Sequence, residues 1–200
     1  MSTDTEPVEG LNARSIVIVG GSGTGKSTLA RALQEQLLPI QWLHFSVDTI
    51  LYCLPTSILD RANLRNDWSL IDAHSVRRSA YACLRALLDD ERRVIFDCVV
   101  MSERGARELL LALETYRPIL IELTCSWEET LRRTRARGDR THEEAEHGFK
   151  TAGLHLNADH TFDTTIRNHR ELASAVIHAC QGQGVHRAWD ANLARLRGAS

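Results

Sequence analysis

One nine-residue stretch constrains the fold of this chain more than any other. Residues 20–28 read GGSGTGKST and directly follow the apolar run SIVIV at residues 15–19. They match the pattern G-x-x-x-x-G-K-[ST], in which a glycine-rich turn joins a buried strand to a helix. Backbone N–H groups of such a turn surround phosphate oxygens, and the helix N-terminus adds a partial positive charge. The stretch therefore predicts an α/β domain of the P-loop NTPase type.

The loop residues are expected to bind a nucleoside triphosphate. Lys26 would reach the β- and γ-phosphates, and the hydroxyl of Ser27 would ligate Mg²⁺. The alternative is an ordinary glycine-rich turn. Such a turn would not require a preceding strand and a following helix, and the sequence predicts both here. The predicted nucleotide-binding residues of the loop are Gly20, Gly21, Ser22, Gly23, Thr24, Gly25, Lys26, Ser27 and Thr28.

Apolar, strand-like runs alternate with helical patterns along the rest of the chain. Strands are expected at 15–19, 42–47, 93–100, 118–125 and 160–165, and helices at 27–38, 68–90, 103–115, 126–137 and 168–181. Such alternation indicates a five-stranded parallel sheet with helices on both faces. Two weakly patterned stretches, 55–69 and 137–160, are expected to be long loops, one forming an acceptor-side wall and the other a cover over the nucleotide.

The expected domain organisation is one domain with two short extensions. Residues 1–13 are predicted to form a flexible tail, and residues 14–183 the P-loop domain. In residues 184–200, Trp189, Leu193 and Leu196 recur at helical spacing. This stripe predicts a helical tail that docks on the same domain.

Composition limits which classes of partner and which cellular compartment are expected for this chain. The formal net charge of the 200 residues is −2, which disfavours nucleic acid as a partner. No apolar run approaches the length of a membrane span, so no membrane partner is expected. Five cysteines without a C-x-x-C pair favour a reducing compartment, and we expect a cytoplasmic protein. Self-association as a homo-oligomer stays open.

Asp97 is the predicted second metal residue. It ends the apolar part of the run RRVIFDCVV at residues 92–100. In phosphate-loop proteins a strand-terminal carboxylate of this kind holds Mg²⁺ directly or through water. A buried strand can also end in Asp for other reasons, so the interpretation depends on the phosphate loop.

A row of arginines follows the fourth expected strand. Arg133, Arg137 and Arg140 are spaced i, i+4 and i+7, which places them on one helical face. Guanidinium groups suit the charge that spreads over a transferred γ-phosphoryl group. We therefore assign Arg133 to nucleotide binding and Arg137 and Arg140 to catalysis. The alternative is a solvated basic face paired with nearby acids such as Glu128 and Glu129.

Asp48 is the candidate acceptor-side carboxylate. The run WLHFSVD at residues 42–48 alternates, so Asp48 ends the second strand at the carboxyl edge, where open α/β sheets bind ligands. A carboxylate there could accept the proton of an acceptor hydroxyl or orient that hydroxyl. Asp48 could also be the N-cap of a helix beginning at Thr49. Both roles can coexist.

With these residues identified, the chain resembles the chloramphenicol phosphotransferase family over roughly residues 14–180. The matching pieces are GGSGTGKS, WLHFSVDTI with LP at 54–55, VIFDCVV, RARGDR and FDTT. The resemblance implies a nucleoside-monophosphate-kinase-like P-loop fold that uses ATP and Mg²⁺ to phosphorylate a hydroxyl of an antibiotic. It further implies Asp48 as the base and Arg137 and Arg140 as lid arginines. After Asp97 the sequence departs from the family, reading CVVMSERG.

The expected function is therefore an ATP-dependent O-phosphotransferase with a small hydroxylated acceptor. Its predicted catalytic residues are Lys26, Asp48, Arg137 and Arg140. The acceptor is expected to be an antibiotic, chloramphenicol-like or other, so that phosphorylation confers resistance by inactivation. One alternative keeps the chemistry but uses another hydroxylated natural product, such as a nucleoside antibiotic, or a metabolite. Another is a regulatory NTP-binding switch without an acceptor.

Overall fold

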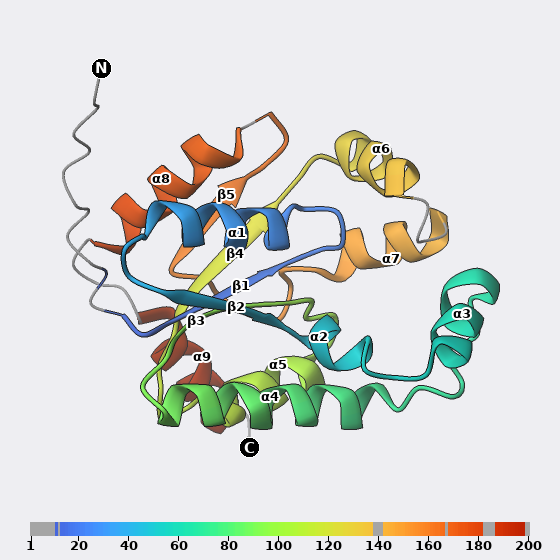
Figure 1. Cartoon of the computed structure of the whole chain (residues 1–200), viewed down its shortest axis with the longest axis horizontal. Helices are drawn as coiled ribbons and strands as arrows, with labels where there is room; N and C mark the ends of the chain where they lie inside the picture. Colours follow the sequence, from blue (N-terminus) through green and yellow to red (C-terminus); the bar gives the residue numbers. More distant parts are fainter. Residues whose placement is uncertain (1–10, 12, 138–141, 167, 182–186, 199–200) are drawn as a thin grey trace.

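A parallel sheet forms the centre of the molecule. The computed structural model describes residues 11, 13–137, 142–166, 168–181 and 187–198, and five strands form one sheet within them. The strands are β1 (Ser15–Gly20), β2 (Trp42–Ser46), β3 (Arg93–Cys98), β4 (Ile119–Thr124) and β5 (His160–Asp163). Their order is β2-β3-β1-β4-β5, and every neighbouring pair is parallel (Figure 1). The predicted five-stranded parallel sheet is confirmed.

Helices cover both faces of this sheet (Figure 1). One face carries α1 (Lys26–Gln36) and α8 (His169–Cys180), and the other α4 (Ala73–Asp89), α5 (Glu103–Ala112) and α9 (Arg187–Gly198). Because strand side chains alternate, β1 contributes to two cores. Ile16 and Ile18 pack beneath α1 and α8, whereas Val17 and Val19 pack on the other side. None of the helices over the described ranges is long and apolar enough for a membrane span.

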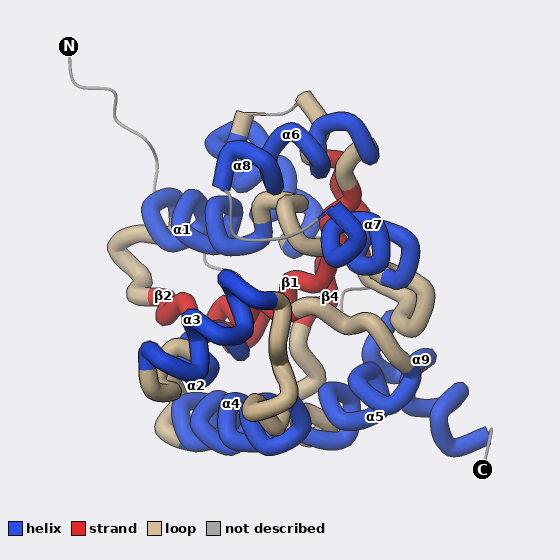
Figure 2. The backbone as a smooth tube through the Cα atoms, turned by 90° about the vertical axis from the view of Figure 1, so that its right-hand side faces the viewer, coloured by secondary structure: helices blue, strands red, loops and turns tan. Residues whose placement is uncertain are grey.

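Further helices gather at the carboxyl ends of the strands. They are α2 (Val47–Leu51), α3 (Thr56–Arg65), α6 (Trp127–Arg137) and α7 (His142–Thr151). Viewed from this end, α3 and α7 flank the strands on opposite sides (Figure 2). The carboxyl edge of the sheet is therefore bordered by helical segments on two sides.

Both stretches expected to be long loops contain a helix, so those predictions are wrong. Residues 55–69 contain α3, where only Ala62 is fully buried. Residues 137–160 contain α7, where Ala145 is buried and Gly148 interrupts the helical pattern. Glycine weakens a helical signal, and a helix that buries few side chains has almost no apolar stripe to recognise. Tertiary contacts at the sheet edge therefore outweigh the weak local pattern.

The interpretation of Asp48 as a helix N-cap is also wrong. Helix α2 begins at Val47, and Ser46 is its N-cap. The Thr49 N–H donates to Ser46 Oγ at 3.2 Å, and the Ser46 N–H donates to Thr49 Oγ1 at 3.2 Å, which forms a capping box. Asp48 instead lies in the first helical turn, where the helix dipole favours a carboxylate. Its side chain is therefore not needed to start the helix.

The two ends of the chain contact the core. Leu11 and Ala13 are buried beneath α1, whereas residues 1–10 and 12 of the predicted tail lie outside the described ranges. Near the other end, Trp189 and Leu193 of α9 are buried in the core that α4 and α5 cover. Trp189 has no exposed surface. Helix α9 is therefore part of the packing of this face.

Replacing Trp189 with Ala should destabilise the fold. The change removes a fully buried indole, and truncations of this kind cost about 3–5 kcal/mol. The free energy of unfolding, measured by urea titration, would give this value. Trp68→Ala is the matched control, because Trp68 is 39% exposed and its loss should cost about 1 kcal/mol or less. Equal losses for the two variants would contradict the assigned role of α9.

Candidate active site

The phosphate loop between β1 and α1 approaches its neighbours so closely that glycine is required. Gly20 has a φ of 151°, and a Cβ there would lie 2.5 Å from the carbonyl oxygen of Leu123 in β4. Gly25 is the N-cap of α1, with a left-handed φ of 88°. Side chains at these positions would collide with β4 or strain the start of the helix. The two glycines thus fix the loop beside the central strands.

Lys26 is buried and held inside this loop. Its Nζ donates to the carbonyl oxygens of Gly20, at 3.0 Å, and Gly21, at 2.8 Å. Thr24 Oγ1 also donates to the Gly21 oxygen, at 2.8 Å. A buried ammonium requires such acceptors, and phosphate oxygens can replace them when a nucleotide binds. Ser27, one residue further, is exposed in the first turn of α1.

An arginine of α6 ties the loop to the end of β5. Arg133 Nη2 donates to the carbonyl oxygen of Thr164 at 2.7 Å, and Nη1 lies 3.3 Å from the carbonyl oxygen of Gly23. The Thr164 hydroxyl is 3.2 Å from Arg133 Nη1 and donates to the Thr24 carbonyl at 2.9 Å. This network joins the loop, α6 and the segment after β5. Arg133 therefore lies at the phosphate loop, and its role in nucleotide binding stays a prediction.

The basic face of α6 is partly paired with acid, as the alternative interpretation expected. Glu129 accepts hydrogen bonds from Arg132 and Arg133, which hold the pKa of its carboxyl at about 2. Arg133 thus contacts both Glu129 and the loop. Arg137 ends α6 one turn later, but its side chain and the whole of Arg140 lie outside the described residues. Their catalytic role stays a prediction.

Asp97 lies near the end of β3 with its side chain on the α1 face of the sheet. Alternation gives it the same face as Ile95, which packs beneath α1. It is 5% exposed, and His44 of β2 donates from Nε2 to its Oδ2 at 2.6 Å. No residue within the described ranges donates a hydrogen bond to Oδ1. That oxygen is therefore available to a metal-bound water.

The oxygen donors at this edge fit Mg²⁺ bound together with a nucleotide. Mg²⁺ prefers hard oxygen ligands, keeps several waters and needs only one or two protein ligands beside phosphates. The Asp97 carboxylate and the exposed Ser27 hydroxyl match that requirement. Groups of three or more His, Cys, Asp or Glu that could form an all-protein site do not occur among the residues searched, which are the described ones.

Lys26, Asp48 and Asp97 lie at or after the carboxyl ends of β1, β2 and β3, respectively. Burial raises the pKa of the Cys98 thiol to about 12. The charges of Asp97 and Asp48 raise it as well, whereas Lys26 lowers it. All three charged groups therefore lie within electrostatic reach of one buried thiol at the end of β3. The roles of these three residues in phosphoryl transfer stay predictions.

Helix α7 lies directly over the phosphate loop. A Cβ on Gly21 would be 3.4 Å from the carbonyl oxygen of Gly148, and 3.5 Å from the Cβ of Ala152, which follows α7. A cavity of about 190 Å³ lies between this segment, the loop and the end of β4. Trp127 of α6 contacts Phe149 of α7, with ring centroids 5.4 Å apart. The two helices together cover the loop.

Three residues of this site were not predicted as site residues: His44, Glu129 and Thr164. Alternation along β2 puts His44 on the same face as Ser46. Its contact with Asp97 depends on β2 lying beside β3, and local patterns do not report strand order. Thr164 belongs to the run FDTT, which was quoted only as part of the family resemblance. Its contact with the loop could not be predicted from its residue type.

Comparisons with known proteins agree with the geometry. Two strains of Mycobacterium tuberculosis each have a relative that carries the provisional name O-phosphotransferase. Each relative is 32% identical over 186 residues, spanning 83% of this chain and 81% of the relative. Among solved structures, the APS kinase of Mycobacterium tuberculosis superimposes with a TM-score of 0.61 at 17% identity, over 85% of this chain and 98% of that chain. Shikimate kinase from Acinetobacter baumannii gives 0.58 at 18% identity, over 84% and 93%.

The structural neighbours share the fold of P-loop kinases, which confirms the predicted fold class. Residues 13–181 match the family described as chloramphenicol phosphotransferase-like protein, close to the range over which the resemblance was predicted. A match over this much of the chain assigns the family. The chain is a P-loop kinase that belongs to the chloramphenicol phosphotransferase-like family.

Proposed function

We propose that this kinase transfers the γ-phosphoryl group of ATP to a hydroxyl group of an antibiotic and thereby inactivates it. The observation that carries the proposal is the arrangement at the carboxyl edge. The phosphate loop with Lys26 follows β1, Asp48 follows β2, and these two parallel strands lie on either side of β3 in the sheet. A donor site and an acceptor-side carboxylate at one edge are what direct transfer to a hydroxyl requires.

The donor half is built from the loop and α6. Lys26 would leave the carbonyl oxygens that it now contacts and neutralise the β- and γ-phosphates. Arg133 would keep the loop in shape through Thr164. Asp97 and Ser27 would hold Mg²⁺, which when bound supplies charge neutralisation to the phosphate oxygens. His44 would fix the carboxylate of Asp97 by its hydrogen bond.

The acceptor half is built from α2 and the segment that follows it. The capping box of Ser46 and Thr49 fixes the start of α2, and α2 packs on α4. Asp48 thus lies in a helical turn whose start is fixed by this capping box, and it could orient the acceptor hydroxyl. A loose transition state for phosphoryl transfer needs little base assistance, so orientation is its main proposed role.

Side chains after α2 support an acceptor with an apolar body. Tyr52, Leu64, Trp68 and Leu70 are exposed large apolar residues in this segment. Arg61 of α3 is held by Asp67, with Nε 2.5 Å from Oδ2. Its charge is therefore already matched, which favours a neutral hydroxylated molecule over a phosphorylated acceptor.

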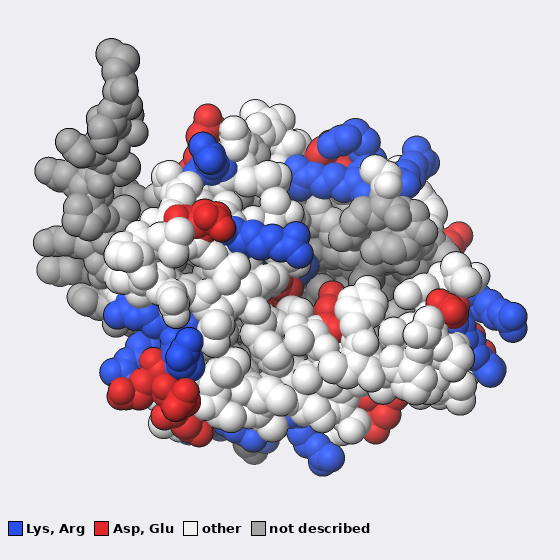
Figure 3. All heavy atoms as spheres, in the orientation of Figure 1, with Lys and Arg blue, Asp and Glu red and all other residues white. Residues whose placement is uncertain are grey.

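The cover over the nucleotide would come from α6 and α7. Figure 3 shows Lys and Arg side chains gathered over α6 at this end of the molecule. Arg137 and Arg140 extend the sequence of that helix and are proposed to stabilise the transferred group. A closed cover also excludes water, which limits futile hydrolysis of ATP.

Incubation with ATP, Mg²⁺ and a panel of hydroxylated antibiotics that includes chloramphenicol tests the proposal. We expect one panel member to gain about 80 Da, the mass of a phosphoryl group that replaces a proton. Cells that produce the protein should then survive that compound. Phosphorylation of a hydroxylated metabolite, with every antibiotic unchanged, would contradict the proposed acceptor while leaving the kinase assignment intact.

Lys26→Ala should abolish transfer with little effect on folding. The variant loses the cation that meets phosphate, and loss of one such stabilising group typically costs about 10²-fold or more in kcat. The rate of phosphorylated product formation measures the loss. Lys150→Ala is the matched control, because Lys150 is the other lysine of the chain and pairs with Glu146 on the outside of α7. Near-normal turnover of Lys26→Ala would exclude the loop as donor site.

Asp48→Asn should leave ATP binding almost intact and lower transfer. Ser46, not Asp48, caps α2, so the fold should tolerate the amide. Loss of positioned acid–base assistance costs about 10²–10⁴-fold, and the low end is expected for a loose transition state. Asp60→Asn on the exposed side of α3 is the control. A parallel loss of nucleotide affinity, measured by calorimetry, would instead assign Asp48 to the metal site.

Arg137→Ala should lower kcat more than it lowers affinity for ATP. The charge that Arg137 is proposed to meet is greatest in the transition state. Steady-state kinetics and direct titration with ATP separate the two effects. Arg135→Ala provides a control on the exposed side of the same helix. Small and equal losses in both variants would support a solvated basic face.

A further inference from the structure

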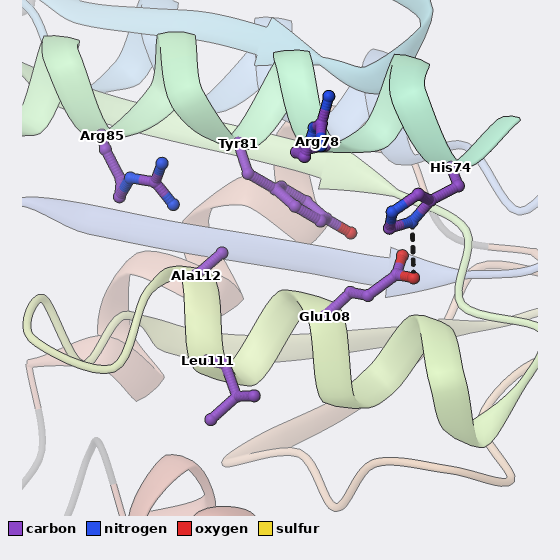
Figure 4. A pocket seen from close by; sticks show the side chains of 7 residues that line it. All are labelled: His74, Arg78, Tyr81, Arg85, Glu108, Leu111 and Ala112. Atoms are coloured by element: carbon purple, nitrogen blue, oxygen red, sulfur yellow. Dashed lines mark hydrogen bonds and ion pairs between the residues drawn. The ribbon is translucent and has the colours of Figure 1, made fainter. Parts of the chain in front are cut away.

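A second cavity lies away from the phosphate loop, in a groove between α4 and α5. Its volume is about 260 Å³. His74, Arg78, Tyr81 and Arg85 of α4 follow helical spacing and therefore line it along one face of that helix. Helix α5 contributes Glu108, Leu111 and Ala112 (Figure 4).

The hydroxyl of Tyr81 is the unusual feature of this groove. The residue is 4% exposed, and its ring packs edge-on against Phe96 with centroids 6.0 Å apart. Within the described part of the chain, no group forms a hydrogen bond with its hydroxyl. Figure 4 shows the hydroxyl in the space between the helices. Buried phenols normally have a partner, so this one is placed to donate to a ligand.

The single acid of the groove wall is already paired. Glu108 accepts hydrogen bonds from His74 Nδ1 at 2.8 Å, Arg77 Nε at 2.9 Å and Arg104 Nε at 2.9 Å. Three donors therefore surround one carboxylate. Its negative charge does not oppose an anion in the groove.

Two exposed guanidinium groups lie at the rim of the groove. Arg78 and Arg85 form no ion pair or hydrogen bond with any residue that the structure describes. Figure 4 shows the Arg85 guanidinium between the helices, along the groove from Tyr81. Two guanidinium groups and a protonated phenol form a donor set that suits carboxylate or phosphate oxygens. Burial also raises the pKa of Tyr81, which keeps the hydroxyl protonated.

We propose that the groove between α4 and α5 binds a small organic anion through its carboxylate or phosphate group. Tyr81 donates to the anionic group, the exposed Arg78 and Arg85 supply positive charge at the rim of the groove, and Leu111 and Ala112 contact the apolar part of the ligand. The cavity is slightly smaller than the roughly 300–1,000 Å³ of pockets for drug-sized ligands, so a ligand with one ring fits.

Calorimetric titration of the whole chain with benzoate, phenyl phosphate and neutral benzyl alcohol tests this site. We expect saturable binding of at least one anion and none of the alcohol. Binding of benzoate alone identifies a carboxylate ligand, and binding of phenyl phosphate alone identifies a phosphate ester. The titrations are repeated with Lys26→Ala, because phenyl phosphate can also enter the phosphate loop. Binding in the groove should persist in that variant.

Two groove variants complete the test. Tyr81→Phe and the double variant Arg78→Gln, Arg85→Gln should each weaken binding by about tenfold or more, since each loses hydrogen bonds to a charged group. Tyr81→Phe keeps the ring contact with Phe96, so its melting temperature without ligand should not fall. Tyr116→Phe is the control, because the Tyr116 hydroxyl donates to Asp89 outside the groove.

Three outcomes would overturn the proposal. The first is that neither anion shows saturable binding. The second is that Lys26→Ala abolishes binding whereas the groove variants retain it, which would place the anion in the phosphate loop. The third is a concentration-dependent rise in mass that the groove variants abolish, without anion binding. That result would assign the groove to contact between two copies of the chain.

Discussion

The close contact of the phosphate loop with β4 and α6 is the constraint on which the rest of the structure depends. At Gly20 the backbone lies so near the Leu123 carbonyl that a Cβ would be 2.5 Å away. Arg133 and Thr164 hold the other side of the loop through its carbonyl groups. The Lys26 ammonium group donates hydrogen bonds to carbonyl oxygens of the same loop. The loop therefore has its shape before a nucleotide arrives, which reduces the ordering that binding must impose.

The order of the strands in the sheet places other groups on both sides of the phosphate loop. Because β1 lies between β3 and β4, the loop is flanked by Asp97 on one side and by α6 and α7 on the other. Strand β2 lies beyond β3 and leads into α2, which brings Asp48 to the same edge. The residues proposed for metal, donor and acceptor functions thus follow different strand ends. A crevice at the carboxyl edge of an open α/β sheet is where ligands bind in such folds.

Much of this arrangement could be predicted from the sequence because its signals are local. The loop motif lies within nine residues, and the strands appear as short apolar runs between turns. Asp97 and Asp48 could be found because each follows such a run. Helices α3 and α7 were missed because each buries little surface and so lacks an apolar stripe. Ser46 was missed as the cap because the run WLHFSVD looks like a strand up to its aspartate.

Features that depend on pairs of elements could not be predicted. The His44–Asp97 hydrogen bond requires β2 beside β3, and the groove at Tyr81 requires α4 beside α5. Residue spacing within one element contains no information on its neighbour. Arg133 shows the intermediate case, since its helical face was predicted but its partner Thr164, 31 residues later, was not.

A crystal structure with a non-hydrolysable ATP analogue and Mg²⁺ would test the central claim most directly. We expect Lys26 Nζ to leave the Gly20 and Gly21 carbonyl oxygens and to contact the terminal phosphates. Mg²⁺ should lie between those phosphates, the Ser27 hydroxyl and water bound to Asp97, with Asp48 facing the γ-phosphate across the acceptor space. A triphosphate bound elsewhere, or Lys26 still on the loop carbonyls beside it, would contradict the claim that this edge performs phosphoryl transfer.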